Sequence, residues 1–444
     1  MQTNRIHISE SFGGRLDPLQ FHYERMDMIH NIMSTKQWCK LKDVVRNVKT
    51  TTKELSVSDV YIGLENITSN TGDYIPTSEK GTISSAAVFT KGDILFPKLR
   101  PYLNKVYRAE FNGKCSTEFH VFQAKKIDAD FLTIVLRSNL VVAQTKHLMT
   151  GNTLPRLQTS DIENLIIPLP PVSVQREIVE LYTKAQAEKQ AKEAQAKALL
   201  DGVDSYLLTE LGITLPKTSE RQLVFKVKCS DILGQRLDTS FYKDKFELIS
   251  TKYQNKKLSD IVIINPSVNL KSFNDNDEIT FIPMEVVDEI FGTIVENRIT
   301  TISNTKGFTK FEDNDLLWAK ITPCMQNGKS AIARNLKNGI GCGSTEFYVL
   351  RPKDSETSIE YIYLLLRHHK VLESAKNSFG GSAGQQRVSS GYLKSISIPT
   401  PPIEVQKNIA TTIELRKAQA NQLQAEASQA LDTAKNKIEK LILE

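Results

Sequence analysis

The sequence predicts an α+β fold made of two copies of one unit, each a mixed helix-and-strand domain followed by a long helix. Three observations predict it: a set of motifs that occurs twice in the same order, strand-like runs within each copy, and a proline-free helical segment at the end of each copy. With 444 residues, the chain is long enough for about three folding units. Its 40% hydrophobic and 24% charged residues are typical of a globular protein.

The duplication is clearest in three motifs. Arg-Leu-Asp at 15–17 returns 221 residues later (236 − 15), and Ser-Thr-Glu-Phe at 116–119 returns letter for letter after 228 (344 − 116). The run Ile-Pro-x-Pro-Pro-x-x-Val-Gln, which begins at Ile167, returns after 231 (398 − 167). The order is kept and the spacing changes only slightly, as small loop insertions would cause. The chain is therefore two copies of a unit of about 220 residues.

The first part of each copy alternates turn residues with short runs rich in Val, Ile, Phe and Tyr. Such runs predict strands, for example at 60–62, 119–122 and 346–350. Helical periodicity appears between them at 131–140 and 359–368.

The second part of each copy is predicted to be one long helix. Pro171 and Pro402 favour a helix start just after them, and 174–211 is rich in Ala, Gln, Glu and Lys without proline. In the C-terminal helix an apolar seam recurs every three or four residues, at Ile409, Ile413, Arg416, Ala420, Leu423, Ala427, Ala430, Ala434, Ile438 and Leu441. We expect the two helices to pack as a coiled coil about an approximate two-fold axis and to set a fixed spacing. Packing of each helix within its own domain is the alternative.

These features predict four segments. Residues 1–170 and 215–401 are the two domains, and 171–214 and 402–444 are the central and C-terminal spacer helices.

Familiar catalytic and cofactor-binding motifs are missing from the sequence. Gly328-Lys329-Ser330 looks like the end of a Walker A loop, but Pro323 stands where its first glycine is required. There is no GxGxxG, no HExxH, no CxxC, and no Asp or Glu two positions before a lysine. We therefore expect a protein that is not an enzyme and has no catalytic, cofactor or metal site on this chain.

Basic residues mixed with aromatic ones suggest contact with nucleic acid. The formal charge is +6, and segments 91–108 and 314–337 carry net charges of +4 and +3 at matching places in the two copies. Glycine-rich loops at 151–156 and 380–387 each end in an arginine that could contact a phosphate. The candidate DNA-binding residues are Lys91, Lys98, Arg100, Tyr102, Lys105, Arg108, Arg156, Lys320, Lys329, Arg334 and Arg387.

Each of these assignments has a plainer alternative. The basic segments could be solvated surface, the glycine-rich loops could be simple linkers, and Ser-Thr-Glu-Phe is better explained by a turn or packing role than by a catalytic Ser/Glu pair.

The chain resembles the specificity subunit of type I restriction-modification systems, and the resemblance extends over essentially its whole length. The duplicated Ile-Pro-x-Pro-Pro-x-x-Val-Gln with its helix, the Arg-Leu-Asp runs and the paired Ser-Thr-Glu-Phe carry the resemblance. It implies two target recognition domains, each reading half of a split DNA target, and spacer helices packed antiparallel. Because the two copies are not identical, we expect the two halves of the target to differ and the target to be asymmetric. The resemblance also implies two methyltransferase (modification) subunits that bind S-adenosylmethionine, and nuclease-translocase (restriction) subunits that use ATP and magnesium.

Other functions stay open from the sequence alone. A specificity subunit of a modification-only system, a duplicated scaffold that binds no DNA, and a self-contained nuclease or methyltransferase are the alternatives. No apolar run approaches the roughly 18 residues needed to span a bilayer and the first ten residues are polar, so we expect a cytoplasmic protein.

Overall fold

The structure is a computed structural model. It describes residues 21–35, 37–54, 56, 59–77, 84–151, 153–214, 226, 248–380 and 386–443. Both Arg-Leu-Asp runs lie outside these residues.

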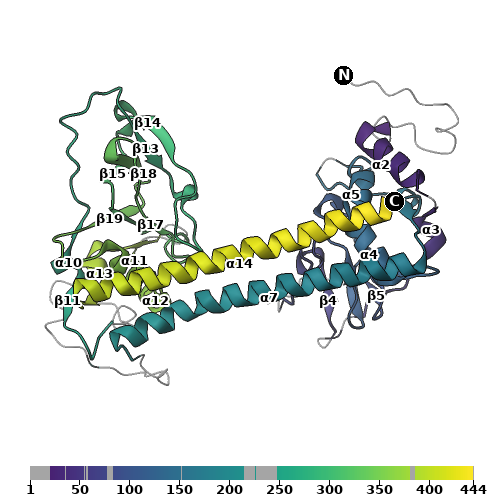
Figure 1. Cartoon of the computed structure of the whole chain (residues 1–444), viewed down its shortest axis with the longest axis horizontal. Coiled ribbons are helices and arrows are strands. Elements are labelled where there is room, and N and C mark those ends of the chain that lie inside the picture. The colour runs from purple at the N-terminus through teal and green to yellow at the C-terminus, as the bar shows by residue number, and fades with distance from the viewer. Residues whose placement is uncertain are drawn as a thin grey trace. The chain divides into compact units, whose positions relative to one another are not determined.

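The chain divides into two compact units. Unit 1 comprises residues 1–193 and 424–444, and unit 2 comprises residues 194–423. Each unit holds one copy of the helix-and-strand domain, and the two long helices α7 (Val172–Leu211) and α14 (Ile403–Leu443) supply residues to both units (Figure 1). The predicted α+β class with two long helices is confirmed. Among the described residues, no helix combines the length and apolar character needed to cross a membrane.

Unit 1 is built on two four-stranded sheets and one two-stranded ribbon. One sheet has the order β2-β9-β6-β7 and is antiparallel, the second has the order β3-β5-β8-β4 with β4 parallel to β8, and β1 pairs with β10. The elements are α2 (Tyr23–Met33), β1 (Trp38–Lys40), α3 (Leu41–Val44), β2 (Val45–Val48), β3 (Thr51–Thr52), β4 (Tyr61–Ile62), η2 (Leu64–Asn66), β5 (Ala86–Phe89), β6 (Ile94–Pro97), η3 (Pro101–Leu103), β7 (Tyr107–Arg108), β8 (Gly113–Ser116), β9 (Phe119–Ala124), α4 (Ala129–Arg137), α5 (Asn139–Lys146), α6 (Thr159–Glu163) and β10 (Ile166–Pro168).

Unit 2 repeats this plan, and among the described residues its second sheet differs in the position of one strand. Its antiparallel sheet β12-β19-β16-β17 corresponds to β2-β9-β6-β7, but the extra strand of the second sheet, β14-β13-β18-β15, lies at the opposite edge from β3. The elements are β11 (Asn255–Lys257), α10 (Leu258–Ile261), β12 (Val262–Ile264), β13 (Glu278–Ile282), η4 (Met284–Val286), β14 (Arg298–Thr301), η5 (Ile302–Thr305), β15 (Thr309–Glu312), β16 (Leu316–Ala319), β17 (Ser330–Ile332), η6 (Lys337–Gly339), β18 (Ile340–Gly343), β19 (Phe347–Pro352), α11 (Ile359–Arg367), α12 (His369–Asn377), β20 (Phe379–Gly380), β21 (Arg387–Val388), α13 (Ser390–Ser395) and β22 (Ser397–Pro399).

The central strands are apolar on both faces because each face is covered. In β9, Phe122 packs into the core shared with the helices, whereas Phe119 and Val121 pack between the two sheets. In β16, Trp318 and Leu317 divide in the same way. This two-sided burial explains why these strands appear in the sequence as largely hydrophobic runs without strict polar alternation.

The prediction of one helix at 131–140 is wrong in one respect, because the structure has two helices there. α4 ends at Arg137, and Ser138 adopts an extended conformation before α5 begins at Asn139. Asp128 caps α4 by accepting hydrogen bonds from two backbone amides at 2.9 Å. In unit 2 the predicted helix at 359–368 is confirmed as α11, capped by Ser358.

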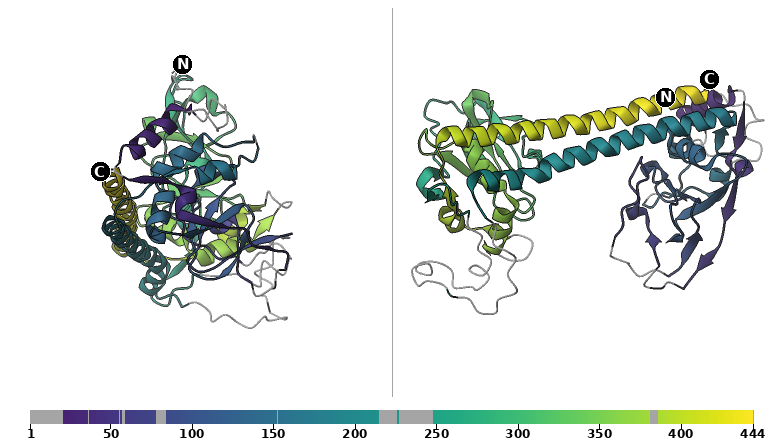
Figure 2. Two further views of the ribbon diagram at one scale, coloured as in Figure 1. Left: turned by 90° about the vertical axis from the view of Figure 1, so that its right-hand side faces the viewer. Right: turned by 60° about the horizontal axis from the view of Figure 1, so that its bottom comes forward.

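The long helices pack against each other within each unit. In unit 1, the beginning of α7 and the end of α14 share one core, and Lys192 of α7 binds Glu426 of α14 at 3.1 Å. In unit 2, the end of α7 and the beginning of α14 share the other core, and the Arg416 guanidinium lies 4.3 Å from the centroid of the Tyr206 ring. The helices are therefore antiparallel, as the resemblance implied (Figure 2).

Most of the predicted seam is buried, including Ile409, Ile413, Ala420, Ala427 and Ile438. Near the C-terminus two positions of the seam are displaced by one residue. Leu431 and Ile442 are buried there, whereas Ala430 and Leu441 are only half-buried.

Candidate nucleic-acid interface

The same three charged residues come together in both units, at the end of the central strand pair. In unit 1, Lys98 directly follows β6, Glu118 directly precedes β9, and Arg156 lies in the loop before α6. The Arg156 guanidinium binds the Glu118 carboxylate through Nε at 3.0 Å and Nη2 at 2.8 Å. The Lys98 amide donates to the Glu118 carbonyl at 2.8 Å, and the Leu157 amide donates to the Lys98 carbonyl at 3.0 Å.

Unit 2 reproduces this arrangement bond for bond. Arg387 Nε and Nη2 bind the Glu346 carboxylate at 2.9 and 2.8 Å. The Lys320 amide donates to the Glu346 carbonyl at 2.9 Å, and the Val388 amide donates to the Lys320 carbonyl at 2.9 Å. We call these two sets the Lys-Glu-Arg clusters.

Each cluster combines two basic residues with one glutamate, a formal net charge of +1. Hydrogen bonds from Arg156 hold the pKa of Glu118 below its ordinary value against the opposing effect of burial, and the charges of Arg156 and Lys98 lower it further. Arg387, followed by Lys320, lowers the pKa of Glu346 in the same way. The two arginine side chains remain 43% and 42% exposed, so each cluster presents a guanidinium of fixed orientation to solvent. That geometry suits a phosphate oxygen.

One position beside the clusters differs between the units. In unit 1 it is His120, which is 8% exposed and lies 3.1 Å from the Asn47 amide through Nδ1. Burial lowers the pKa of His120 to about 4, and the nearby charges of Lys98 and Lys49 act in the same direction. In unit 2 it is Tyr348, whose hydroxyl donates to the Val388 carbonyl at 2.9 Å and whose ring lies 5.3 Å from the Lys320 ammonium.

His120 should make the stability of unit 1 depend on pH. Folded His120 is neutral above about pH 4, whereas the unfolded chain takes up a proton near 6.5, so acid stabilises the unfolded state. We expect unit 1 to lose up to about 3 kcal/mol as the pH falls from 6.5 to 4, and His120→Gln to remove that loss. Urea unfolding at several pH values measures this loss of stability in the unchanged chain and in the variant. Tyr348→Phe is the control at the matching position, and an unchanged pH slope in His120→Gln would contradict the assignment.

Arg100 and Tyr102 lie next to the cluster of unit 1. Arg100 adopts a left-handed conformation with φ of 48°, and its amide donates to the carbonyl of Pro155, the residue before Arg156, at 2.9 Å. Tyr102 is 44% exposed on η3. The structure therefore brings Lys98, Arg100 and Arg156 together, and Tyr102 follows in the next turn.

Two other predicted lysines have a structural partner inside their own domain. The Lys105 ammonium donates to the Leu64 carbonyl at 2.8 Å, and the Lys329 ammonium lies 3.4 Å from the Met284 carbonyl. Leu64 and Met284 begin the matching 3₁₀ turns η2 and η4. These bonds stabilise the turns, and they occupy the two ammonium groups that we predicted to contact DNA.

The remaining candidates lie in a cleft between each domain and its long helix. In unit 1 the cleft has a volume of about 790 Å³, and Lys91 and Arg108 line it. Arg108 pairs there with Asp130 at 3.0 Å. In unit 2 the matching cleft has a volume of about 420 Å³ and contains the ion pair of Arg334 with Glu360. The predicted residues thus form three groups, one at the clusters, one at the 3₁₀ turns and one in the clefts.

Sequence reasoning missed Glu118 and Glu346 as members of the site. Their motif was assigned to a turn or to packing, and the turn is present, since Ser116 and Ser344 each accept a hydrogen bond from the glutamate amide two residues on, at 3.2 Å. The signal that could have found the pairing was the letter-for-letter repeat of the motif together with an arginine at the end of each glycine-rich loop.

The whole arrangement can be compared with known proteins. The family model described as the type I restriction modification DNA specificity domain matches the chain twice, at residues 33–199 and 250–432. The chain belongs to this family. The resemblance to the specificity subunits of type I restriction-modification systems, seen in the sequence, is thereby confirmed.

Specificity subunits of Escherichia coli are among its relatives. Those of the type I restriction enzymes EcoEI and EcoAI are each 35% identical to it over 186 residues, which is 42% of this chain. The match spans 31% of each of these relatives. A solved structure described as the structural basis of complex assembly and conformational transition of the type I R-M system shares the fold. It has a TM-score of 0.52 and 18% identity, and the alignment covers 91% of this chain and 96% of that one.

Proposed function

We propose that this chain is the subunit that reads a bipartite, asymmetric target in double-stranded DNA, with one half read by each domain. The observation that carries the proposal is the occurrence of the same Lys-Glu-Arg cluster, with the same backbone bonds, in both units. Two equivalent cationic sites on one chain suit a ligand that offers the same chemical group twice. The phosphodiester backbone of DNA is such a ligand.

The comparison between the units also suggests which residues contact the DNA backbone and which read the bases. Side chains that are identical in both units cannot distinguish two different half-sites, so we assign Lys98, Arg156, Lys320 and Arg387 to the phosphate backbone. Base reading then belongs to features in which the units differ. The described differences include the additional edge strand, β3 in unit 1 and β14 in unit 2, and the second residue of β9 or β19, His120 or Tyr348.

The partners follow from the same role. We propose that the antiparallel helices set the gap between the half-sites, and that the chain assembles with two methyltransferase subunits and with nuclease-translocase subunits. S-adenosylmethionine, ATP and magnesium would then be bound by those partners, with no cofactor on this chain. The family membership and the sharing of α7 and α14 by both units support this arrangement.

The test is to purify the chain with its methyltransferase subunit and to methylate a random DNA pool. We expect one split motif of two unlike halves, methylated only when this chain is present, and sequencing of the modified bases reads it directly. The methyltransferase alone is the control. Modification without a motif would contradict the proposal, as would a single undivided motif or methylation by this chain alone.

A further inference from the structure

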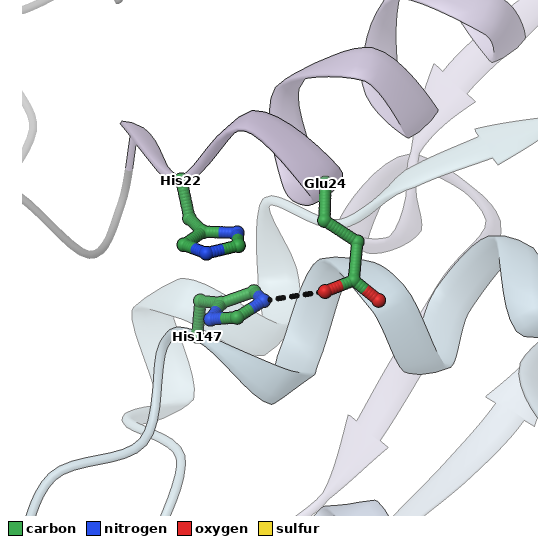
Figure 3. Close-up of side chains that lie close together, drawn as sticks. All are labelled: His22, Glu24 and His147. Atoms are coloured by element: carbon green, nitrogen blue, oxygen red, sulfur yellow. Dashed lines mark hydrogen bonds and ion pairs between the residues drawn. The ribbon is translucent and has the colours of Figure 1, made fainter. Parts of the chain in front are cut away.

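Two histidines and a glutamate gather in unit 1, in a place that the DNA-reading role does not use. His22 caps the N-terminus of α2, Glu24 lies in the first turn of α2, and His147 ends α5 (Figure 3). One ligand atom from each residue lies within 4.8 Å of the other two. The two imidazole rings are stacked with centroids 3.6 Å apart, and His147 Nε2 lies 3.0 Å from a Glu24 carboxylate oxygen.

One atom of this group has no partner that explains its burial. His22 Nδ1 is shielded from solvent and makes no hydrogen bond to any residue that the structure describes. A buried ring nitrogen without a partner costs free energy, so its persistence here points to a ligand. A metal ion would satisfy it, because a neutral imidazole nitrogen is a common metal ligand.

We propose that His22, Glu24 and His147 bind a divalent transition-metal ion of the zinc class. Two imidazoles and one carboxylate are a donor set that zinc accepts, and three protein ligands leave a fourth position for water. The ion joins the beginning of α2 to the end of α5, two helices that already pack together. Its role is to fasten α2 to the domain.

The two rings must rotate out of their stacked arrangement before an ion can bind, because the lone pair of each imidazole nitrogen lies in the plane of its ring. Ligand atoms around tetrahedral zinc lie about 3.3 Å apart for bonds of about 2.05 Å, so the three atoms must close by up to about 1.5 Å. Rotation of the stacked rings and of Glu24, whose side chain is 36% exposed, supplies that movement.

Lys146 is the internal competitor for the site. Its ammonium lies 3.1 and 3.2 Å from the two Glu24 oxygens and gives the carboxylate a cationic partner. The Lys146 side chain is 51% exposed, so it can turn to solvent when a metal ion replaces it. Lys146→Gln should therefore strengthen metal binding, an effect that a purely structural ion pair would not produce.

A second group of similar composition lies in unit 2 and serves as the internal control. Asp204 binds His369 Nδ1 there, and His368 is close by. The His368 side chain is fully buried, and its Nε2 lies 3.9 Å from the Asp204 carboxylate. The buried ring cannot turn toward an ion as readily as the half-buried rings of His22 and His147, so we place the metal in unit 1.

The experiment is titration of the full chain, freed of metal with a chelator, with Zn²⁺ against a chromophoric competitor, and with Co²⁺ followed by its visible ligand-field absorption. We expect His22→Ala and His147→Ala each to weaken Zn²⁺ binding by roughly tenfold or more and to abolish the Co²⁺ band. His30→Ala, an exposed histidine on the same helix, and His369→Ala should leave both unchanged. Lys146→Gln should tighten Zn²⁺ binding.

Circular dichroism of each variant establishes that it is folded, and His147→Gln provides a second variant with a smaller change of shape. Zn²⁺ binding that survives the His22→Ala/His147→Ala double substitution would overturn the proposal. Loss of binding in His369→Ala alone would overturn it too, as would the absence of stoichiometric binding in the unchanged chain.

Discussion

Replacing both Arg156 and Arg387 by alanine should weaken binding to every DNA sequence by about a hundredfold, roughly tenfold for each arginine, at 0.15 M salt. Both side chains are held by a glutamate and exposed by more than 40%, so each presents its charge to a phosphate without first being ordered. The loss should be uniform across sequences, because the two clusters are identical and cannot carry the difference between half-sites.

Salt dependence separates this explanation from a general loss of charge. If each arginine contacts one phosphate, the slope of log affinity against log salt should fall by about 1.8 in the double variant. Lys197→Ala/Lys407→Ala is the control, since it removes two exposed cations from α7 and α14 outside the clusters. Fluorescence anisotropy at several salt concentrations measures the affinity and its salt dependence for the double variant and for the control. An equal effect in the control would refute the contact, and a changed methylation motif would show that the arginines read bases.

Asp315→Ala should destabilise unit 2 by about 3 kcal/mol, the largest stability effect that we expect from a single substitution outside the apolar core. Asp315 is 1% exposed and accepts three hydrogen bonds at 2.7 Å, one from the Glu312 amide and two from the Arg351 guanidinium. These bonds to Asp315, together with the charge of Glu312, raise the pKa of Arg351. Without Asp315, the partly buried guanidinium keeps Glu312, at 2.8 Å, as its one carboxylate partner among the described residues.

Unit 1 offers the matched control for this substitution. Asp93 occupies the same place (315 − 222) and is also buried, but it accepts only from the amide and hydroxyl of Thr90, at 2.8 and 3.0 Å. Gln123 stands where unit 2 has Arg351. Asp93→Ala should therefore cost only about 1–2 kcal/mol.

Urea unfolding of the full chain measures both variants, and Asp315→Ala/Arg351→Met should recover much of the loss by removing the stranded charge together with its partner. Equal costs in the two units, or no recovery in the double variant, would contradict the argument.

Several elements could be predicted because their signal is local. The strands at 60–62, 119–122 and 346–350 correspond to β4, β9 and β19 within one or two residues, and both long helices begin just after their Pro-Pro pairs. Periodicity and proline act on neighbouring residues, so they are visible in the chain itself. The interruption at Ser138 was missed because no glycine or proline marks it.

The partners of the charged residues could not be predicted in the same way. Lys98 and Lys105 lie seven residues apart in one basic segment, yet one belongs to a Lys-Glu-Arg cluster and the other donates to the carbonyl of Leu64. Arg108, three residues further on, lies in the cleft with Asp130. The turn η3 lies between Lys98 and the other two residues, so their side chains reach different parts of the domain. The net charge of the segment does not show where each side chain lies.

The sequence by itself thus determined the duplication, the two long helices and the family, because repetition and periodicity are properties of residue order. Only the tertiary structure decided that Glu118 holds Arg156, and that the extra strand lies at opposite edges of the two sheets. The physical reason is distance along the chain. Glu118 and Arg156 are 38 residues apart, and the backbone bonds between Lys98, Glu118 and Leu157 bring them together only when the sheet has formed.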